Sequence, residues 1–242
     1  MAQSSALSRK DMREPDRFQV VANRAAAWLS ARKKPAILVG GAVALLVVAA
    51  IATASVRTSR AEAAGRATSA LLDLVAAPIV AKPAEGDTSR SFPTEEAKER
   101  AVVAEADQIL AKYGAGRSGL LAVLVKGDAL YELKEWDKAQ SEYERYLGEA
   151  QKGDSLRFGA LEDLGLVAEA KGDLEGAARA YERMGREAPP FADRADLERA
   201  RVLAAAGKID EARQILLKFA ENHKDSSLVG QASQRLERLG AK

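Results

Sequence analysis

The stretch Pro35–Val56 reads PAILVGGAVALLVVAAIATASV and contains no charged residue. As an α-helix its 22 residues would be about 33 Å long, and the hydrocarbon core of a bilayer is about 30 Å thick. A single segment crosses a bilayer only as a helix, because its backbone N–H and C=O groups must be hydrogen-bonded within the segment. A buried helix of a soluble protein this long would normally have a polar stripe. The stretch therefore predicts a transmembrane helix over 35–56.

The charges around this stretch predict its orientation. Arg32, Lys33 and Lys34 precede it, and residues 1–34 hold eight Lys and Arg against three acidic residues, a net charge of +5. The rest of the chain carries −3. Positive flanks stay on the cytoplasmic side. We therefore expect a single-pass protein of the bacterial inner membrane, with a cytoplasmic N-terminus and a periplasmic C-terminal domain.

A cleaved signal peptide is the alternative interpretation of the same stretch. Ala52-Thr53-Ala54 has the A-x-A pattern of a cleavage site at the end of the apolar run. The charged region before the run is long, however, and the run exceeds the usual apolar core of a signal peptide. We expect an uncleaved anchor, and whether the site is cut stays open.

The basic segment 1–34 predicts an amphipathic helix from about Pro15. Its apolar residues follow helical spacing and form one face: Phe18, Val21, Ala25, Trp28 and Leu29. Arg17 and Arg24 flank that face along one edge. A basic helix with an aromatic residue beside a span suits the cytoplasmic membrane surface. A plain topology signal without a partner explains the same residues equally well.

After the span, helical spacing continues, and 57–76 is expected to form a helical stalk. Residues 77–93 contain three prolines and a glycine and predict a linker. From Thr94 to the end the spacing is helical throughout, with no alternating strand pattern. Thr94 is the expected N-cap of the first helix, which Gly114 is expected to end. Residues 94–242 therefore predict an all-α domain.

An internal repeat organises that domain. Three segments have a small residue, an alanine twelve residues later and a large residue four further on: Gly127, Ala139 and Tyr143; Gly165, Ala177 and Tyr181; Ala200, Ala212 and Leu216. Two antiparallel helices approach closely only where small residues meet, so we expect the glycines and alanines to meet at each crossing.

The first small residues of the three segments lie 38 and 35 residues apart, which resembles the tetratricopeptide repeat with its period of about 34. The longer first spacing indicates a small insertion near 148–154. We predict a tetratricopeptide-like α-solenoid of about three helical hairpins, preceded by a half-repeat over 94–113 and followed by a capping helix over 227–239. Whether the third repeat packs as a full repeat stays open.

The first helices of such hairpins line a concave face that binds proteins. That face is predicted to contain Leu124, Asp128, Tyr131, Glu162, Leu166, Glu169, Leu197 and Arg201. The set mixes apolar and acidic groups and lacks the Lys, Asn and Arg residues with which cytosolic chaperone-tail binders hold a C-terminal carboxylate. We therefore predict a protein-binding groove that does not use that mode.

The residues that catalysis needs are scarce. The chain has no cysteine, and its only histidine, His223, lies at an expected helix end. It contains no phosphate-binding glycine loop, and its mildly acidic main domain argues against nucleic-acid binding. We expect no enzyme activity, no catalytic residue, no cofactor, no metal site and no small-molecule substrate.

The order of these parts resembles one family, the YfgM-like ancillary subunit of the SecYEG translocon. The likeness rests on residues 16–28 (DRFQVVANRAAAW), the basic-flanked span, and 120–149 with Ala139. It implies a non-catalytic subunit that links exported proteins to periplasmic chaperones, with translocon subunits and a membrane-anchored periplasmic prolyl isomerase as partners. The longer N-terminus and the 77–93 linker depart from the family. A tetratricopeptide scaffold of another cell-envelope, division or secretion complex is the alternative.

Overall fold

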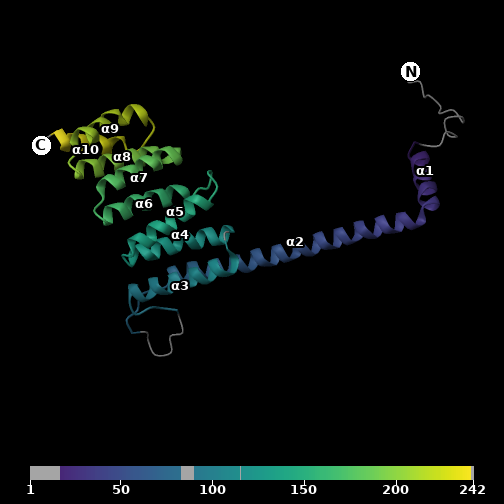
Figure 1. Ribbon diagram of the computed structural model, residues 1–242. Coiled ribbons are helices and arrows are strands. Elements are labelled where there is room, and N and C mark those ends of the chain that lie inside the picture. Colours follow the sequence, from purple (N-terminus) through teal and green to yellow (C-terminus); the bar gives the residue numbers. More distant parts are fainter. Residues whose placement is uncertain (1–16, 83–89, 115, 241–242) are drawn as a thin grey trace, which may run out of the picture. The chain divides into compact units, whose positions relative to one another are not determined.

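The computed structural model describes residues 17–82, 90–114 and 116–240 (Figure 1). The expected helix start near Pro15 and residues 83–89 of the expected linker lie outside these ranges. The side chains of Arg17, Phe18 and Leu29, on the expected amphipathic helix, are also outside the described part. The chain divides into two compact units, residues 1–59 and 60–242, and each is treated separately below.

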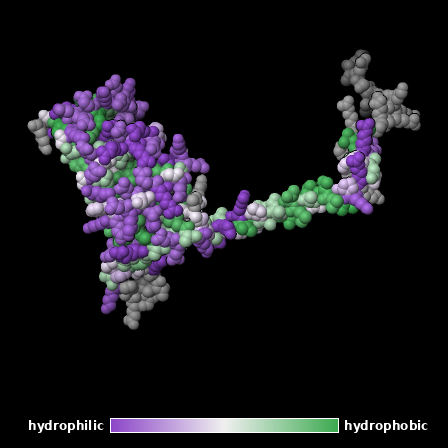
Figure 2. Space-filling model, in the orientation of Figure 1, coloured by the Kyte–Doolittle hydropathy of each residue, from purple (hydrophilic) through white to green (hydrophobic). Residues whose placement is uncertain are grey.

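The first unit holds α1 (Arg17–Ala31) and the beginning of α2 (Lys33–Val75). Pro35 lies in the first turn of α2, where its missing N–H leaves no hydrogen bond unmade. The apolar side chains that follow have no protein cover: Ile37 is 74% exposed and Leu45 73% (Figure 2). Among the described residues, Ile37–Val75 is the one helix that is long and apolar enough to be a candidate membrane span.

The second unit is a solenoid in which each helix packs mainly against the helices before and after it in the chain (Figure 1). Three hairpins, α4–α5, α6–α7 and α8–α9, follow α3 and precede α10, which confirms the all-α solenoid of about three hairpins. The bounds of its helices are α3 (Glu95–Tyr113), α4 (Arg117–Glu132), α5 (Trp136–Glu149), α6 (Arg157–Ala170), α7 (Leu174–Glu187), η1 (Pro189–Phe191), α8 (Ala192–Ala205), α9 (Ile209–Asn222) and α10 (Val229–Gly240).

Local sequence sets where these helices begin and turn. The Thr94 hydroxyl accepts a hydrogen bond from the backbone N–H of Ala97, so Thr94 caps α3, and Gly114 follows its last residue with φ of 62°. Gly172 and Gly207 have φ near 80° in the turns within the second and third hairpins. Lys134 occupies the corresponding turn of the first hairpin with φ of 61°, a conformation that glycine adopts with less strain.

The close helix approach within the hairpins differs in detail from the expected meeting of small residues. A Cβ added to Gly127 would lie 2.7 Å from the ring of Tyr143, and one on Gly165 would lie 2.5 Å from the ring of Tyr181. The nearest neighbour of each glycine is therefore the tyrosine of the second helix, for which the missing side chain makes room. The alanines Ala139, Ala177 and Ala212 are fully buried in the core instead.

The end of α2 belongs to the solenoid. Leu71 and Leu74 are fully buried in one apolar cluster with residues of α3 and α4, including Val102 and Ile109. The end of the segment expected to be a stalk therefore packs on the helix that was predicted as a half-repeat, α3.

The described ends of the expected linker are joined to each other. The backbone N–H of Val80 donates to the carbonyl of Phe92 (2.8 Å), and the N–H of Phe92 donates to the carbonyl of Pro78 (3.1 Å). The chain thus leaves α2 and returns at the same place before α3. The described residues 77–82 and 90–93 therefore lie side by side next to the packed helices α2 and α3, and are not a spacer between two domains.

Candidate protein-binding groove

The predicted groove residues lie on α4, α6 and α8, the first helices of the three hairpins. Leu124 and Leu197 are the exceptions to the prediction, because they are only 8% and 2% exposed and pack in the core. Each lies three residues before the small residue of its repeat, Gly127 or Ala200. Residues three apart share a helix face, so both leucines point into the hairpin with that residue.

Tyrosines of the second helices hold two of the predicted groove carboxylates. The hydroxyl of Tyr143 on α5 donates to Asp128 on α4 (2.9 Å), and that of Tyr181 on α7 donates to Glu169 on α6 (2.8 Å). Burial, together with these neighbouring acids, raises the pKa of both tyrosine hydroxyls. They therefore remain protonated donors, and each of these two hairpins presents a carboxylate whose position is fixed by a tyrosine of its own core.

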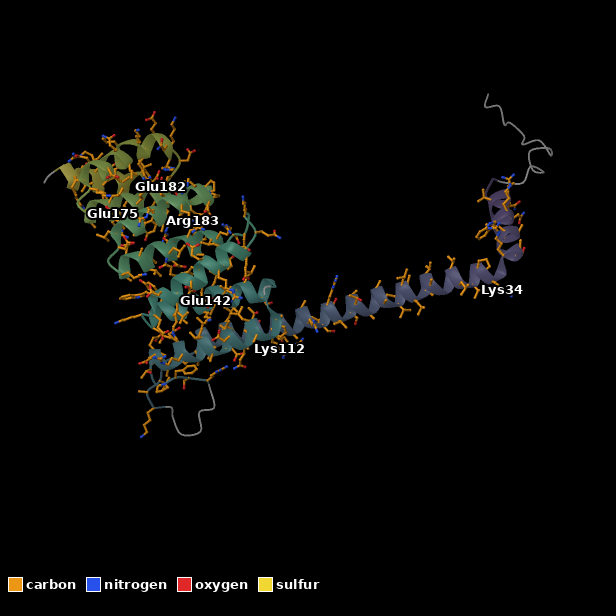
Figure 3. The ribbon with its side chains drawn as sticks, in the orientation of Figure 1. Lys34, Lys112, Glu142, Glu175, Glu182 and Arg183 are labelled. Carbon is orange, nitrogen blue, oxygen red and sulfur yellow. The ribbon has the colours of Figure 1, made fainter. Side chains whose placement is uncertain are left out.

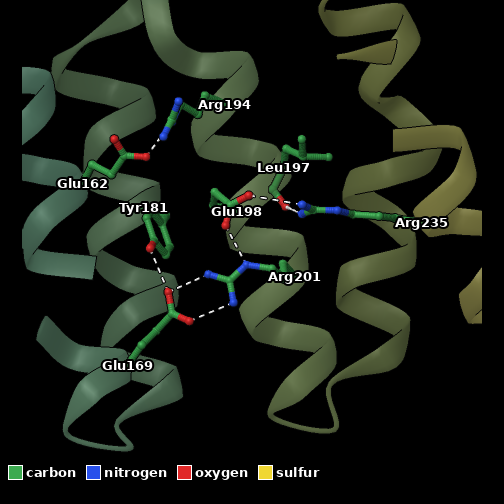
Figure 4. Close-up of polar contacts among 8 residues, drawn as sticks. All are labelled: Glu162, Glu169, Tyr181, Arg194, Leu197, Glu198, Arg201 and Arg235. Carbon is green, nitrogen blue, oxygen red and sulfur yellow. Dashed lines mark hydrogen bonds and ion pairs between the residues drawn. The ribbon is translucent and has the colours of Figure 1, made fainter. Parts of the chain in front are cut away.

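In the C-terminal half of the groove the charges bind one another (Figure 4). Arg201 of α8 donates to both oxygens of Glu169, at 2.6 and 2.8 Å, and to Glu198 at 2.6 Å. Arg235 of α10 reaches Glu198 and the carbonyl of Leu197. The structure thus brings together the predicted residues Glu169 and Arg201, and their ion pair links neighbouring hairpins.

The same network governs the protonation of Glu169. Burial alone would raise the pKa of this carboxyl, but the hydrogen bonds from Arg201 and Tyr181 outweigh it and leave the pKa below its usual value. Glu162, another predicted groove residue, is half-buried and pairs with Arg194 of α8 at 2.5 Å. In this half of the groove the acidic side chains already have cationic partners within the protein.

The junction of α4 and α6 has a different electrostatic character. Burial raises the pKa of Asp163 on α6 to about 7, with further contributions from Asp128 and Glu162. Burial also raises the pKa of Asp128, and the hydrogen bond from Tyr143 only partly offsets it. In the described ranges, no Lys, Arg or His forms an ion pair with Asp128 or Asp163. The negative charge of this junction is therefore uncompensated.

Two further predicted residues lie beside these acids. Tyr131 follows Asp128 by three residues on α4, and Leu166 follows Asp163 by three on α6, so each pair shares a helix face. Tyr131 is half-buried and Leu166 is 38% exposed. We call Asp128, Tyr131, Asp163 and Leu166 the open groove, because its acidic and apolar groups are available to a partner.

The sequence prediction missed Asp163, Glu198 and Arg235. Asp163 could have been found, because it lies three residues before Leu166, which was already placed on the groove face. Arg235 and Glu198 lie 37 residues apart, and no local pattern indicates that their side chains meet. The hydrogen bonds that the tyrosine hydroxyls donate to Asp128 and Glu169 were also missed, because the position of these tyrosines in the repeat indicates only that their rings pack in the core.

A second hollow, of about 710 Å³, lies between the end of α2, α4 and the loop after α5. Leu72 and Leu156, among its lining residues, are 45% and 44% exposed. The loop contains the insertion that the repeat spacing indicated, and it is anchored at both ends. Tyr146 donates to Asp154 (2.7 Å), and Arg157 donates to the carbonyl of Leu147 (2.7 Å).

Ion pairs also link the second helices of successive hairpins. Arg183 of α7, marked in Figure 3, binds Glu144 of α5 at 2.8 Å.

His223 lies at the C-cap of α9, and its Nε2 is 2.9 Å from a carboxylate oxygen of Asp196 on α8. Over residues 17–82, 90–114 and 116–240, no group of three or more His, Asp or Glu side chains is placed to hold a metal ion.

A comparison with protein-family models supports the repeat type. A tetratricopeptide-repeat family model matches residues 194–226, which include most of α8 and all of α9. Two similar solved structures are a Podosopora anserina putative kinesin light chain with nearly identical TPR-like repeats and a variant of it. Both are 15% identical and cover 59% of this chain and 77% of their own, with TM-scores of 0.49 and 0.48. None of the curated proteins matches this chain.

Proposed function

We propose that this protein is a non-catalytic, membrane-anchored interaction module whose open groove binds a segment of a protein partner. Tetratricopeptide repeats are scaffolds for protein interactions in general, and the open groove is the observation that carries the proposal. Among the described residues, no Lys, Arg or His pairs with its carboxylates, whereas those of the C-terminal half have cationic partners. A partner segment that places Lys or Arg beside an apolar side chain would complement Asp128, Asp163 and Leu166.

The finer proposal is an ancillary role at the Sec translocon of the bacterial inner membrane. It is supported by the order of parts: a basic N-terminal segment, a candidate span and a tetratricopeptide solenoid. With the span in the membrane and the solenoid in the periplasm, the tether would raise the effective concentration of the groove near emerging chains. The proposed partners are translocon subunits and a membrane-anchored periplasmic prolyl isomerase, and exported proteins would pass to periplasmic chaperones.

The alternative is a scaffold of another cell-envelope, division or secretion complex. The same groove and the same tether suit that role. The two proposals therefore differ in the identity of the partner and not in the chemistry of the groove.

Site-specific photo-crosslinking in native membranes tests both proposals. Probes are placed at Tyr131 and Leu166 in the open groove. The control probe replaces Leu217, an apolar residue of α9 that is 55% exposed and lies on a second helix. We expect the groove probes, and not the Leu217 probe, to capture translocon subunits and a periplasmic prolyl isomerase.

Two other outcomes are decisive. Capture of division or secretion components without the translocon would overturn the Sec role and support the alternative. Equal capture by the groove probes and the Leu217 probe would overturn the groove itself. The Asp163→Asn variant, which keeps the side-chain shape but removes the charge, should reduce capture from Leu166 if the partner segment is cationic.

A further inference from the structure

Helix α1 has an apolar side that no other described part of the protein covers. Val21 and Trp28 are 65% and 55% exposed. At roughly 100° per residue, Val21, Ala25 and Trp28 lie on one side of the helix. The polar residues lie on the opposite side: Gln19, Asn23 and Ser30. A helix of 15 residues is marginally stable alone in water, so this side needs an apolar environment.

The charge of α1 and its surroundings favours an anionic surface. The helix contains no acidic residue. Arg24 lies one helical turn from Trp28, and the guanidinium of Arg32, just after the helix, is 5.8 Å from the centre of the Trp28 ring. Lys34 follows in the first turn of α2 (Figure 3). Basic groups therefore lie beside the apolar side of the helix.

The position of α1 along the chain identifies the surface. The helix ends at Ala31, and the apolar stretch of α2 begins at Pro35. With that stretch in the membrane, α1 ends within a few residues of the lipid headgroups. An amphipathic helix with basic residues and a tryptophan binds at this interface, with its apolar side among the upper acyl chains.

We infer that α1 is a membrane-surface helix that binds anionic phospholipids, with Val21, Ala25 and Trp28 toward the acyl chains and Arg24 and Arg32 among the headgroups. The inference rests on the membrane span of the proposed function. It does not depend on what the open groove binds.

The test uses the full chain with Trp136→Phe, which leaves Trp28 as its single tryptophan. The protein is reconstituted into phosphatidylcholine vesicles with or without phosphatidylglycerol. Trp28 fluorescence is then quenched from water by acrylamide or from the bilayer by brominated acyl chains. With phosphatidylglycerol we expect a several-fold smaller acrylamide quenching constant and stronger quenching by the brominated lipid, and we expect added salt to weaken both effects.

Two matched variants separate membrane binding from a general effect of charge. Val21→Asp and Asn23→Asp each add one negative charge, the first on the apolar side of α1 and the second on the polar side. Only Val21→Asp should make Trp28 fully accessible to acrylamide. Arg24→Gln should reduce the protection of Trp28 in anionic vesicles and leave the result in neutral vesicles unchanged.

Three results would overturn the inference. In the first, the protein floats with the vesicles but Trp28 is equally accessible to acrylamide with and without anionic lipid. In the second, Trp28 is protected equally in both and salt has no effect, which would assign the apolar side to a protein contact such as a second copy. In the third, the protein does not float with the vesicles, which would also overturn the membrane span.

Discussion

Two carboxylates of α6, six residues apart, differ in their effect on folding at neutral pH. Glu169 accepts hydrogen bonds from Arg201 and Tyr181, and its pKa is lowered despite its burial. Burial and the charges of Asp128 and Glu162 oppose the ionisation of Asp163, and its pKa rises to about 7. Ionised Glu169 therefore stabilises the folded state, whereas ionised Asp163 destabilises it.

Asp163→Asn should therefore stabilise the solenoid in a pH-dependent way. The pKa of Asp163 is about 7 in the folded protein and near 3.8 ordinarily, so folding favours its protonated form. The stability that this preference contributes is complete below about pH 4 and is lost as the pH rises through 7. At about pH 8 the variant should gain about 1–2 kcal/mol in free energy of unfolding, a value reduced for solvent screening. Near pH 4 the two proteins should be equal.

Urea unfolding at the two pH values measures this difference. Glu221→Gln is the matched control, because Glu221 is exposed on α9. It should leave the free energy of unfolding unchanged at both pH values. A gain from Asp163→Asn that is the same at both values would show that the aspartate charge is not the cause.

At the scale of the element, much of the solenoid could be predicted because its signals are local. The cap at Thr94 and the end of α3 at Gly114 depend on residues within one turn, and Gly127 and Gly165 were found because the repeat places small residues at a regular spacing. The packing of Leu71 and Leu74 could not be predicted, because their spacing also suits a free stalk. The bond between Glu169 and Arg201 joins residues 32 apart, and its formation depends on how hairpins stack.

The hairpin α6–α7 should not tolerate Gly165→Ala, because the new Cβ would lie 2.5 Å from the Tyr181 ring. We expect a loss of about 1–3 kcal/mol in free energy of unfolding, as for other overpacked cores. The third hairpin carries Ala200 and Leu216 at the same positions. Tyr181→Leu itself loses the hydroxyl bond to Glu169, but in that background Gly165→Ala should cost much less than it does alone.

Thermal and urea unfolding of the single and double variants measures this effect. Gly148→Ala is the control, because a Cβ at Gly148 has no atom within 4 Å, and alanine in a helix should be neutral or slightly stabilising. If Gly165→Ala costs as much in the Tyr181→Leu background as it does alone, the contact with Tyr181 is not the reason that position 165 is glycine.

At the scale of the whole molecule, one helix takes part in both units. α2 includes the candidate span and also ends in the core of the solenoid, where Leu71 and Leu74 are fully buried. A domain boundary placed by composition at residue 93 would separate these leucines from Val102 and Ile109. The boundary found in the structure, between residues 59 and 60, keeps that core intact.

A fragment of residues 60–242 should therefore fold cooperatively, and a fragment of 94–242 should be less stable by several kcal/mol, since each fully buried leucine contributes about 1.5–3 kcal/mol. Urea unfolding compares the two. Within 60–242, Leu71→Ala should lose about 2–5 kcal/mol. The neighbouring Leu72→Ala should lose much less, because Leu72 is 45% exposed. Equal losses at the two positions would contradict the packing of α2 on α3.

The hydrogen bonds that join Phe92 to Val80 and Pro78 have a practical consequence for labelling the protein. Because these bonds hold the chain together where it leaves α2 and where it returns to α3, extra residues inserted between Val80 and Phe92 would lengthen the connection without separating α2 from α3. Doubling the length of a flexible loop costs only about 0.6 kcal/mol. An epitope or a protease recognition sequence inserted there would leave the solenoid assembled. Its accessibility in intact cells and in opened ones would then report which side of the membrane carries the solenoid.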